Sequence, residues 1–376
     1  MKPISATRLR AADATVTVVS NTASVPEWSR RYFGPWWNAF DVPAAGGCTG
    51  PVVTADVNPG RYAQLATGVS GAPHEDTVYA KALTRLATDE HGTIRAVAPS
   101  EELAYVSEPA TGRLAVIGLD AEPVALAAAR LARDVVRGQL LRSGWTLLHA
   151  SAVVRGGKTV LTFGSKGAGK TTTALALAGL GWELLANDRV FVRPGANGTL
   201  KVLPWPSAAA IGLGLLDALD WFDVVRQRLR AGERLHPTQH PDVTNALLTG
   251  RREALWEPGG KRERKVQVFP DQFASWFNIT LASGGHAEAL LFPQIRPDAT
   301  PAIAERPRTL SDADFMSGTT EDRYPDVFGL LQIDGGGTAE ARATVAEQLA
   351  KLPHHSVHLG HNLQANAAFL DRLLRQ

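Results

Sequence analysis

One short stretch limits the fold of this chain more than any other. It runs from Gly164 to Thr172 and fits the pattern Gly-x-x-x-x-Gly-Lys-Ser/Thr without a mismatch. Residues 159–163, just before it, are apolar or β-branched and predict a buried strand, whereas residues 172–180 are rich in Ala and Leu and predict a helix. A strand, a glycine-rich turn and a helix in this order are typical of an α/β fold with a phosphate-binding loop.

The spacing within this stretch suits a nucleoside triphosphate bound together with Mg²⁺. Glycines let the backbone curl so that its N–H groups point at phosphate oxygens, and the N-terminus of the following helix favours anions. Lys170 supplies a positive charge for the phosphates, and the Thr171 hydroxyl is a ligand for Mg²⁺. The alternative, a glycine turn without a ligand, is disfavoured by the complete match. The predicted ATP-binding residues are Gly164, Ser165, Lys166, Gly167, Ala168, Gly169, Lys170, Thr171 and Thr172.

The composition is typical of a globular protein and limits the partners. The 376 residues are enough for two domains, and a hydrophobic content of 44% with 20% charged residues is ordinary for such a chain. The 39 basic and 37 acidic residues nearly cancel, so neither a nucleic acid nor a membrane is expected as a partner. Cys48 is the only cysteine, which excludes a disulfide within the chain and a cysteine-based metal site. Because neither a signal peptide nor a run of about 18 apolar residues is evident, we expect a cytoplasmic protein.

The first predicted domain covers residues 1–120. Four runs, 16–19, 52–55, 103–106 and 114–118, predict strands separated by turns, so this domain is expected to be mixed α+β. It is a candidate for substrate or partner binding. Residues 28–40 hold several Trp, Tyr and Phe side chains, which either fill a thin core, the favoured interpretation, or face a ligand or partner.

The second predicted domain, residues 121–376, is the nucleotide-binding one. A helix over 121–142 is expected to lead into it, and Gly156-Gly157 predicts a hairpin turn between a strand over 145–154 and the strand before the loop. After the loop we expect strands over 182–186, 190–193 and 200–203, a mostly helical stretch over 208–230 and a loop over 238–265. Strand-like patterns over 266–277 and 279–292 and helices over 338–352 and 364–374 complete the prediction.

Two residues outside the loop are candidates for the chemistry. Asp188 follows the strand over 182–186, where a carboxylate beside the phosphates would bind Mg²⁺ or act as a base; the alternative is an Asx turn. His149 lies in the strand predicted over 145–154, where it is either a base or a packed core residue.

Basic residues between 251 and 265 either close over a phosphate or form a solvated loop. Metal binding by His236 and His240, or by the histidines between 354 and 361, is disfavoured by the prolines and by the missing carboxylate.

Three pieces in this order resemble the HPr kinase/phosphorylase family, whose kinase domain is similar to that of phosphoenolpyruvate carboxykinase. They are His149 in Leu-His-Ala-Ser, the phosphate-binding loop, and residues 185–190, Leu-Ala-Asn-Asp-Arg-Val, where HPr kinases have Ala-Asp-Asp-Arg-Val. The specific match covers about residues 145–193, and residues 212–217 are a looser match. The resemblance implies a P-loop HPr kinase-like domain that transfers phosphate from ATP with Mg²⁺, held by Thr171 and Asp188.

The sequence departs from this family where the phosphate would be passed on. The first Asp of the family's Asp-Asp pair, its base, corresponds to Asn187, and an amide cannot take up a proton. The resemblance therefore points to the divergent branch found with peptide natural-product gene clusters, whose members look like kinases of a serine in a precursor peptide. We expect a kinase acting on a hydroxyl of a peptide or small metabolite, with His149, Asn187 and Asp188 as catalytic residues. The alternative is an accessory protein that binds ATP without transferring phosphate. The oligomeric state stays open, a homo-oligomer included.

Overall fold

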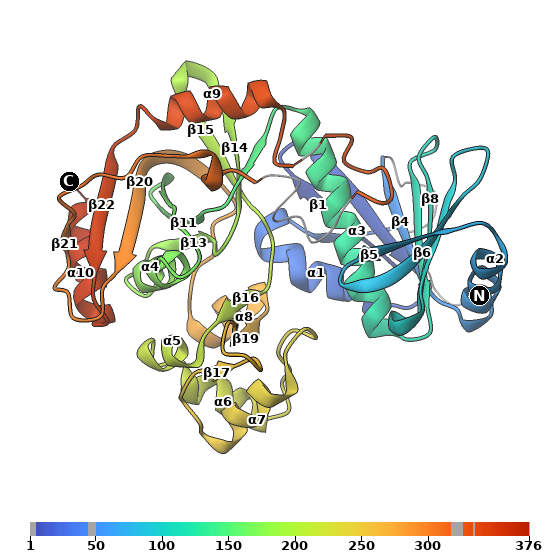
Figure 1. Ribbon diagram of the computed structural model, residues 1–376, viewed down its shortest axis with the longest axis horizontal. Coiled ribbons are helices and arrows are strands. Elements are labelled where there is room, and N and C mark those ends of the chain that lie inside the picture. Colours follow the sequence, from blue (N-terminus) through green and yellow to red (C-terminus); the bar gives the residue numbers. More distant parts are fainter. Residues whose placement is uncertain (1–4, 44–49, 317–325, 334, 376) are drawn as a thin grey trace. The chain divides into compact units, whose positions relative to one another are not determined.

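The computed structural model describes residues 5–43, 50–316, 326–333 and 335–375 (Figure 1). By its internal contacts the chain forms two compact units. Unit 1 comprises Met1–Trp145 and Met316–Thr338, and unit 2 comprises Thr146–Phe315 and Ala339–Gln376. The single cysteine, Cys48, lies outside the described residues. None of the helices within the described ranges is long and apolar enough to cross a membrane.

Unit 1 is built on a nine-stranded mixed sheet with the strand order β3-β1-β2-β4-β9-β8-β7-β6-β5. The β4 strand runs parallel to both β2 and β9, whereas the other neighbours are antiparallel. The four strands expected in this region are confirmed. The elements are β1 (Ser5–Ala11), β2 (Ala14–Ser20), α1 (Ser24–Trp37), β3 (Phe40–Val42), β4 (Val52–Val57), α2 (Pro59–Gly71), β5 (Glu75–Tyr79), β6 (Ala82–Thr88), β7 (Ile94–Ala98), β8 (Leu103–Glu108), β9 (Arg113–Gly118) and α3 (Ala121–Arg142).

Aromatic side chains of α1 belong to the core of unit 1. Tyr32, Phe33, Trp36 and Trp37 are each 5% exposed or less, and the rings of Phe33 and Trp37 stack with their centroids 5.3 Å apart. The interpretation that this cluster fills a thin core is therefore confirmed for these four residues. The α3 helix, expected over 121–142, is also confirmed. It packs against α1, β2 and β4, so the division between the units falls after Trp145 rather than after residue 120.

Unit 2 contains a second nine-stranded mixed sheet, in which β12 and β20 run parallel beside each other and β22 runs parallel to β20. The main strand order is β10-β14-β15-β20-β12-β11-β13. Its elements are β10 (Thr146–Leu148), β11 (Ser151–Arg155), β12 (Lys158–Thr162), α4 (Lys170–Ala178), β13 (Glu183–Ala186), β14 (Val190–Pro194), β15 (Leu200–Pro204), β20 (Gly285–Ile295), β21 (Ala302–Ile303), α9 (Ala339–Leu349), β22 (His354–Leu359) and α10 (Leu363–Leu373). The hairpin at Gly156-Gly157 and the two C-terminal helices are as expected.

Both faces of this sheet are covered by helices (Figure 1). Side chains alternate along a strand, so Val160 packs in the cluster that contains Leu175 of α4, whereas Leu161 packs in the cluster that contains Val345 and Leu349 of α9. A sheet buried on both faces by helices defines an α/β architecture. The expected α/β class is therefore confirmed.

The region between β15 and β20 departs from the prediction. The stretch over 208–230 begins as a strand before becoming helical, the loop over 238–265 contains a helix and a hairpin, and the strand pattern over 266–277 is mostly helix. Pro241 and Pro270 each occupy the first helical turn, where a missing N–H costs nothing, so these prolines start helices rather than prevent them. The elements are β16 (Ala209–Ile211), α5 (Leu213–Ala218), α6 (Phe222–Arg230), α7 (Pro241–Thr249), β17 (Leu255–Trp256), β18 (Glu263–Arg264), β19 (Val266–Val268) and α8 (Pro270–Phe277).

Candidate functional site

The loop between β12 and α4 has the backbone shape that its glycines allow. Gly164, Gly167 and Gly169 have φ angles of +152°, +87° and +99°, which residues with a side chain rarely adopt. A Cβ at Gly169 would also lie 2.8 Å from Cδ1 of Ile295. The predicted order of strand, loop and helix is thus confirmed, and the glycines of the motif are required by the backbone itself.

Lys170, the first residue of α4, lies across this loop. Its side chain is buried, and its Nζ donates hydrogen bonds to the carbonyl oxygens of Gly164, at 2.5 Å, and Ser165, at 3.4 Å. The Ser151 hydroxyl of β11 donates to the carbonyl oxygen of Lys170 at 2.8 Å, which ties the start of the helix to the sheet. An ammonium group is therefore held at the N-terminus of a helix. Its charge and the partial positive charge of the helix dipole both favour an anion there.

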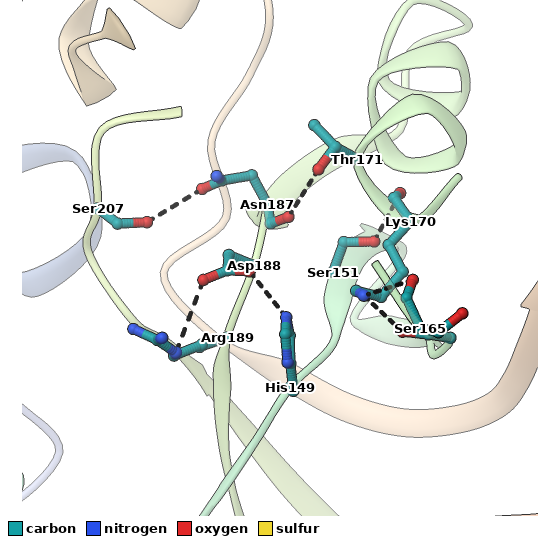
Figure 2. A network of polar contacts seen from close by, with 10 residues as sticks. His149, Ser151, Ser165, Lys170, Thr171, Asn187, Asp188, Arg189 and Ser207 are labelled. Carbon is teal, nitrogen blue, oxygen red and sulfur yellow. Dashed lines mark hydrogen bonds and ion pairs between the residues drawn. The ribbon is translucent and has the colours of Figure 1, made fainter. Parts of the chain in front are cut away.

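Asn187 and Asp188, directly after β13, lie beside the start of α4 (Figure 2). The Thr171 hydroxyl donates to the main-chain oxygen of Asn187 at 3.2 Å, so the helix and this strand end meet. The side chain of Asn187 is buried, and its Oδ1 accepts a hydrogen bond from the Ser207 hydroxyl at 3.3 Å.

His149 and Arg189 both contact the carboxyl group of Asp188. Nε2 of His149 is 3.0 Å from Oδ1, and Nε of Arg189 is 3.6 Å from Oδ2 (Figure 2). Burial opposes the charge on this carboxyl group, but the His149 hydrogen bond and the charges of Arg189, His149 and Lys170 outweigh it and lower the pKa of Asp188 to about 2. Asp188 is therefore ionised near neutral pH, and His149 donates from Nε2 to it.

This arrangement brings the predicted catalytic residues to one place. Figure 2 shows five predicted site residues close together beside the start of α4, namely His149, Lys170, Thr171, Asn187 and Asp188. Sequence reasoning missed three further participants, which are Ser151, Arg189 and Ser207. The first two belong to the segments that carry the family resemblance, whereas the position of Ser207 had no signal, because it follows β15 and reaches Asn187 only in the folded chain.

The residues beside the loop fit Mg²⁺ bound to phosphates. Mg²⁺ usually takes only one or two protein oxygen ligands and completes its shell with phosphate and water. An ionised Asp188 and the Thr171 hydroxyl supply such oxygens. Across the described ranges, three or more His, Cys, Asp or Glu side chains nowhere gather into a group that could hold a metal ion.

Five of the six basic residues between 251 and 265 form ion pairs. Arg252 pairs with Asp217 and, at 2.8 Å, with Asp223, and Arg264 pairs with Asp242. The further pairs are Arg251–Glu253, Arg262–Glu257 and Lys265–Glu263. These contacts favour the interpretation of a solvated, internally paired segment over one that grips a phosphate.

Comparison with known proteins gives a weak structural likeness. No family model matches the chain, and no curated protein matches it either. Among solved structures, the HPr(Ser) kinase/phosphatase from Coxiella burnetii matches over 61% of this chain and 97% of its own, with 13% sequence identity and a TM-score of 0.25. A likeness at this level does not establish a family or a function.

Proposed function

We propose that this protein is an ATP- and Mg²⁺-dependent kinase that phosphorylates a hydroxyl of a peptide or small metabolite, as in the assembly of peptide natural products. One observation carries the proposal: the ionised Asp188 and the Thr171 hydroxyl lie beside a glycine-built loop that holds an ammonium group at a helix N-terminus. These are the groups that phosphoryl transfer requires, namely a phosphate cradle and an oxygen ligand for the metal.

Lys170, Thr171 and Asp188 form the nucleotide side of the proposed site. The loop N–H groups and the Lys170 ammonium bind phosphate oxygens, and Asp188 and Thr171 hold Mg²⁺. When bound, the metal ion neutralises charge that develops on the transferred group. We assign Asp188 to the metal rather than to proton transfer, because a carboxyl group with a pKa of about 2 is a weak base.

His149 and Asn187 form the acceptor side. His149 orients Asp188 through the hydrogen bond of its Nε2 to Oδ1. Asn187 cannot take up a proton, but its amide can orient the acceptor hydroxyl. Because the transition state of phosphoryl transfer is loose, positioning and charge contribute more than a base does, and a base adds roughly 10²–10⁴-fold.

Asn187 also favours a second candidate function. If the acceptor side has lost its role, the protein binds ATP as a conformational ligand and transfers nothing. This alternative predicts nucleotide binding equal to that of a kinase but no labelled product.

The experiment is a transfer assay with γ-labelled ATP, Mg²⁺ and candidate acceptors, including the peptide products of neighbouring genes. We expect label on an acceptor with the natural chain and none with Lys170→Ala. The Asn187→Asp variant then tests the alternative. Transfer gained only in this variant would support a binding protein that lost its base, and tight ATP binding with no transfer to any acceptor would contradict the kinase.

A further inference from the structure

Residues 326–332, here called the docked segment, take an unusual course. They belong to unit 1, although the chain before Met316 and after Thr338 belongs to unit 2. The docked segment forms turns rather than a helix or a strand. Its place in unit 1 must therefore come from contacts other than a regular backbone ladder.

Side chains of unit 1 bind the main chain of the docked segment. The Ser107 hydroxyl of β8 donates to the carbonyl oxygen of Phe328 at 3.1 Å. Nη1 of Arg142, at the end of α3, lies 3.3 Å from the carbonyl oxygens of both Leu330 and Leu331. Hydrogen bonds to main-chain carbonyls do not depend on the side chains of the bound segment, and this is how grooves that accept extended peptides obtain affinity.

Two apolar side chains anchor the docked segment. Phe328 is 2% exposed, and its ring centroid lies 5.1 Å from that of Tyr79 and 5.2 Å from that of Tyr105. Leu331 is 4% exposed, whereas Gly329 between these anchors is exposed. An aromatic side chain in a buried pocket is the usual dominant contact in a peptide or protein interface.

A glycine of α3 leaves room for the main chain of the docked segment. Gly138 lies inside α3, where glycine is less favourable than Ala. A Cβ there would overlap the carbonyl oxygen of Leu330. The helix thus carries an unfavourable residue at the point where the main chain of the docked segment crosses it.

Asp326 gives the docked segment its bend. Its carboxylate accepts hydrogen bonds from the main-chain N–H groups of Leu330, at 2.6 Å, and Leu331, at 2.9 Å. The contact is local to the segment, so a separate peptide of the same sequence can form it too. A cavity of about 170 Å³ borders the segment, and Leu114, Arg142 and Gln332 are among its lining residues.

The residues of unit 1 that contact the docked segment are here called the groove, and they are Tyr79, Tyr105, Ser107, Gly138 and Arg142. We propose that this groove recognises acceptor peptides and that the docked segment occupies it as an internal competitor. The peptides it fits have an acidic residue, an aromatic residue two positions later and a leucine five positions after the acidic one, as Asp326, Phe328 and Leu331 do. That these peptides accept phosphate rests on the proposed function, whereas their binding itself needs no phosphate transfer.

The test uses a fluorescein-labelled peptide with the sequence of residues 326–332 and measures its anisotropy with the full chain. In the double variant Phe328→Ala/Leu331→Ala the internal competitor loses its anchors. Since a groove that is mostly occupied weakens apparent affinity by its free fraction, we expect this variant to bind the peptide about tenfold or more tightly than the natural chain. A peptide with Ala in place of its Phe should bind the variant about tenfold or more weakly.

Gly138→Ala, added to the double variant, places a methyl group in the path of the bound main chain and should abolish peptide binding. Gly68→Ala is the matched control, because Gly68 lies in α2 and an added Cβ there would have nothing within 4 Å. Absence of saturable binding to a double variant with a natural circular dichroism spectrum would overturn the proposal. So would equal binding of the two peptides.

If the double variant does not fold, hydrogen exchange of the natural chain decides. An excess of the peptide should speed exchange at the amides of Leu330 and Leu331 by displacing the docked segment, and the Phe-to-Ala peptide should not. Unchanged exchange would contradict the proposal. Peptide binding without phosphate transfer would contradict the kinase alone, and transfer to peptides that do not compete for the groove would contradict this inference alone.

Discussion

The two sides of the candidate site in unit 2 are built in different ways. On the nucleotide side the backbone of residues 163–169 sets the shape, through glycines with positive φ, and its carbonyl oxygens hold Lys170. On the acceptor side, side-chain hydrogen bonds among residues distant in sequence, such as His149 to Asp188 and Ser207 to Asn187, set the geometry. A side built from backbone tolerates few changes, whereas on a side built from side chains a single substitution changes the chemistry.

Replacing Asp188 with Asn should have the largest effect on transfer. The amide keeps the size of the side chain but removes the charge that we assign to Mg²⁺, so the rate should fall on the order of 100-fold. ATP binding without Mg²⁺ should change little. Glu288→Gln, at an exposed ion pair with Lys158, is the control and should keep full activity. Undiminished transfer by Asp188→Asn would place the metal elsewhere.

Replacing Gly169 with Ala tests the backbone-built side. The substitution forces a positive φ on a residue with a side chain and brings its Cβ against Ile295, so the free energy of unfolding should fall by about 1–3 kcal/mol. Gly167→Ala shares the positive φ but has nothing within 4 Å of the added Cβ, so it should cost less. Urea denaturation measures both, and equal losses would mean that Ile295 does not constrain the loop.

Ser207→Ala probes the acceptor side more gently. The change removes the hydroxyl bonded to Oδ1 of Asn187, and a typical hydrogen bond contributes about 1 kcal/mol, so transfer should fall roughly fivefold. The effect should appear in kcat with KM for ATP unchanged, because the hydrogen bond described for Ser207 is to Asn187 rather than to residues 164–172. A change confined to KM for ATP would contradict a positioning role for Ser207.

The pH dependence of stability gives the smallest predicted effect. The pKa of Asp188 is lowered to about 2, so its ionised form stabilises the fold above the ordinary carboxyl range, and this contribution is lost as pH falls toward 2. The difference in Tm between the natural chain and Asp188→Asn should therefore shrink between about pH 6 and about pH 3. A difference that stays constant over this range would mean that Asp188 has an ordinary pKa.

The nucleotide side could be predicted from the sequence because its determinants are local. The glycine spacing, the apolar strand before it and the Ala- and Leu-rich helix after it are contiguous, and each favours the observed backbone on its own. Four of the nine strands of unit 1 and its long helix were predictable for the same reason. Around Pro241 and Pro270 local reasoning failed, since proline starts a helix or breaks one depending on its position within the turn.

The acceptor side and the division into units could not be predicted in this way. Ser207 reaches Asn187, and residues 326–332 lie in unit 1, only through contacts between segments far apart in the chain. The boundary expected after residue 120 assigned α3 to the second domain, because the amphipathic pattern of a helix shows that it packs but not on which sheet.

The central claim is that the loop of unit 2 binds MgATP through Lys170, and isothermal titration tests it most directly. We expect saturable binding by the natural chain and by Lys158→Ala, which removes an exposed lysine from the start of β12. Lys170→Ala should bind about 100-fold more weakly, since it loses the ammonium group that the loop carbonyls hold. Equal affinity of Lys170→Ala and the natural chain, or no binding by either, would contradict the claim.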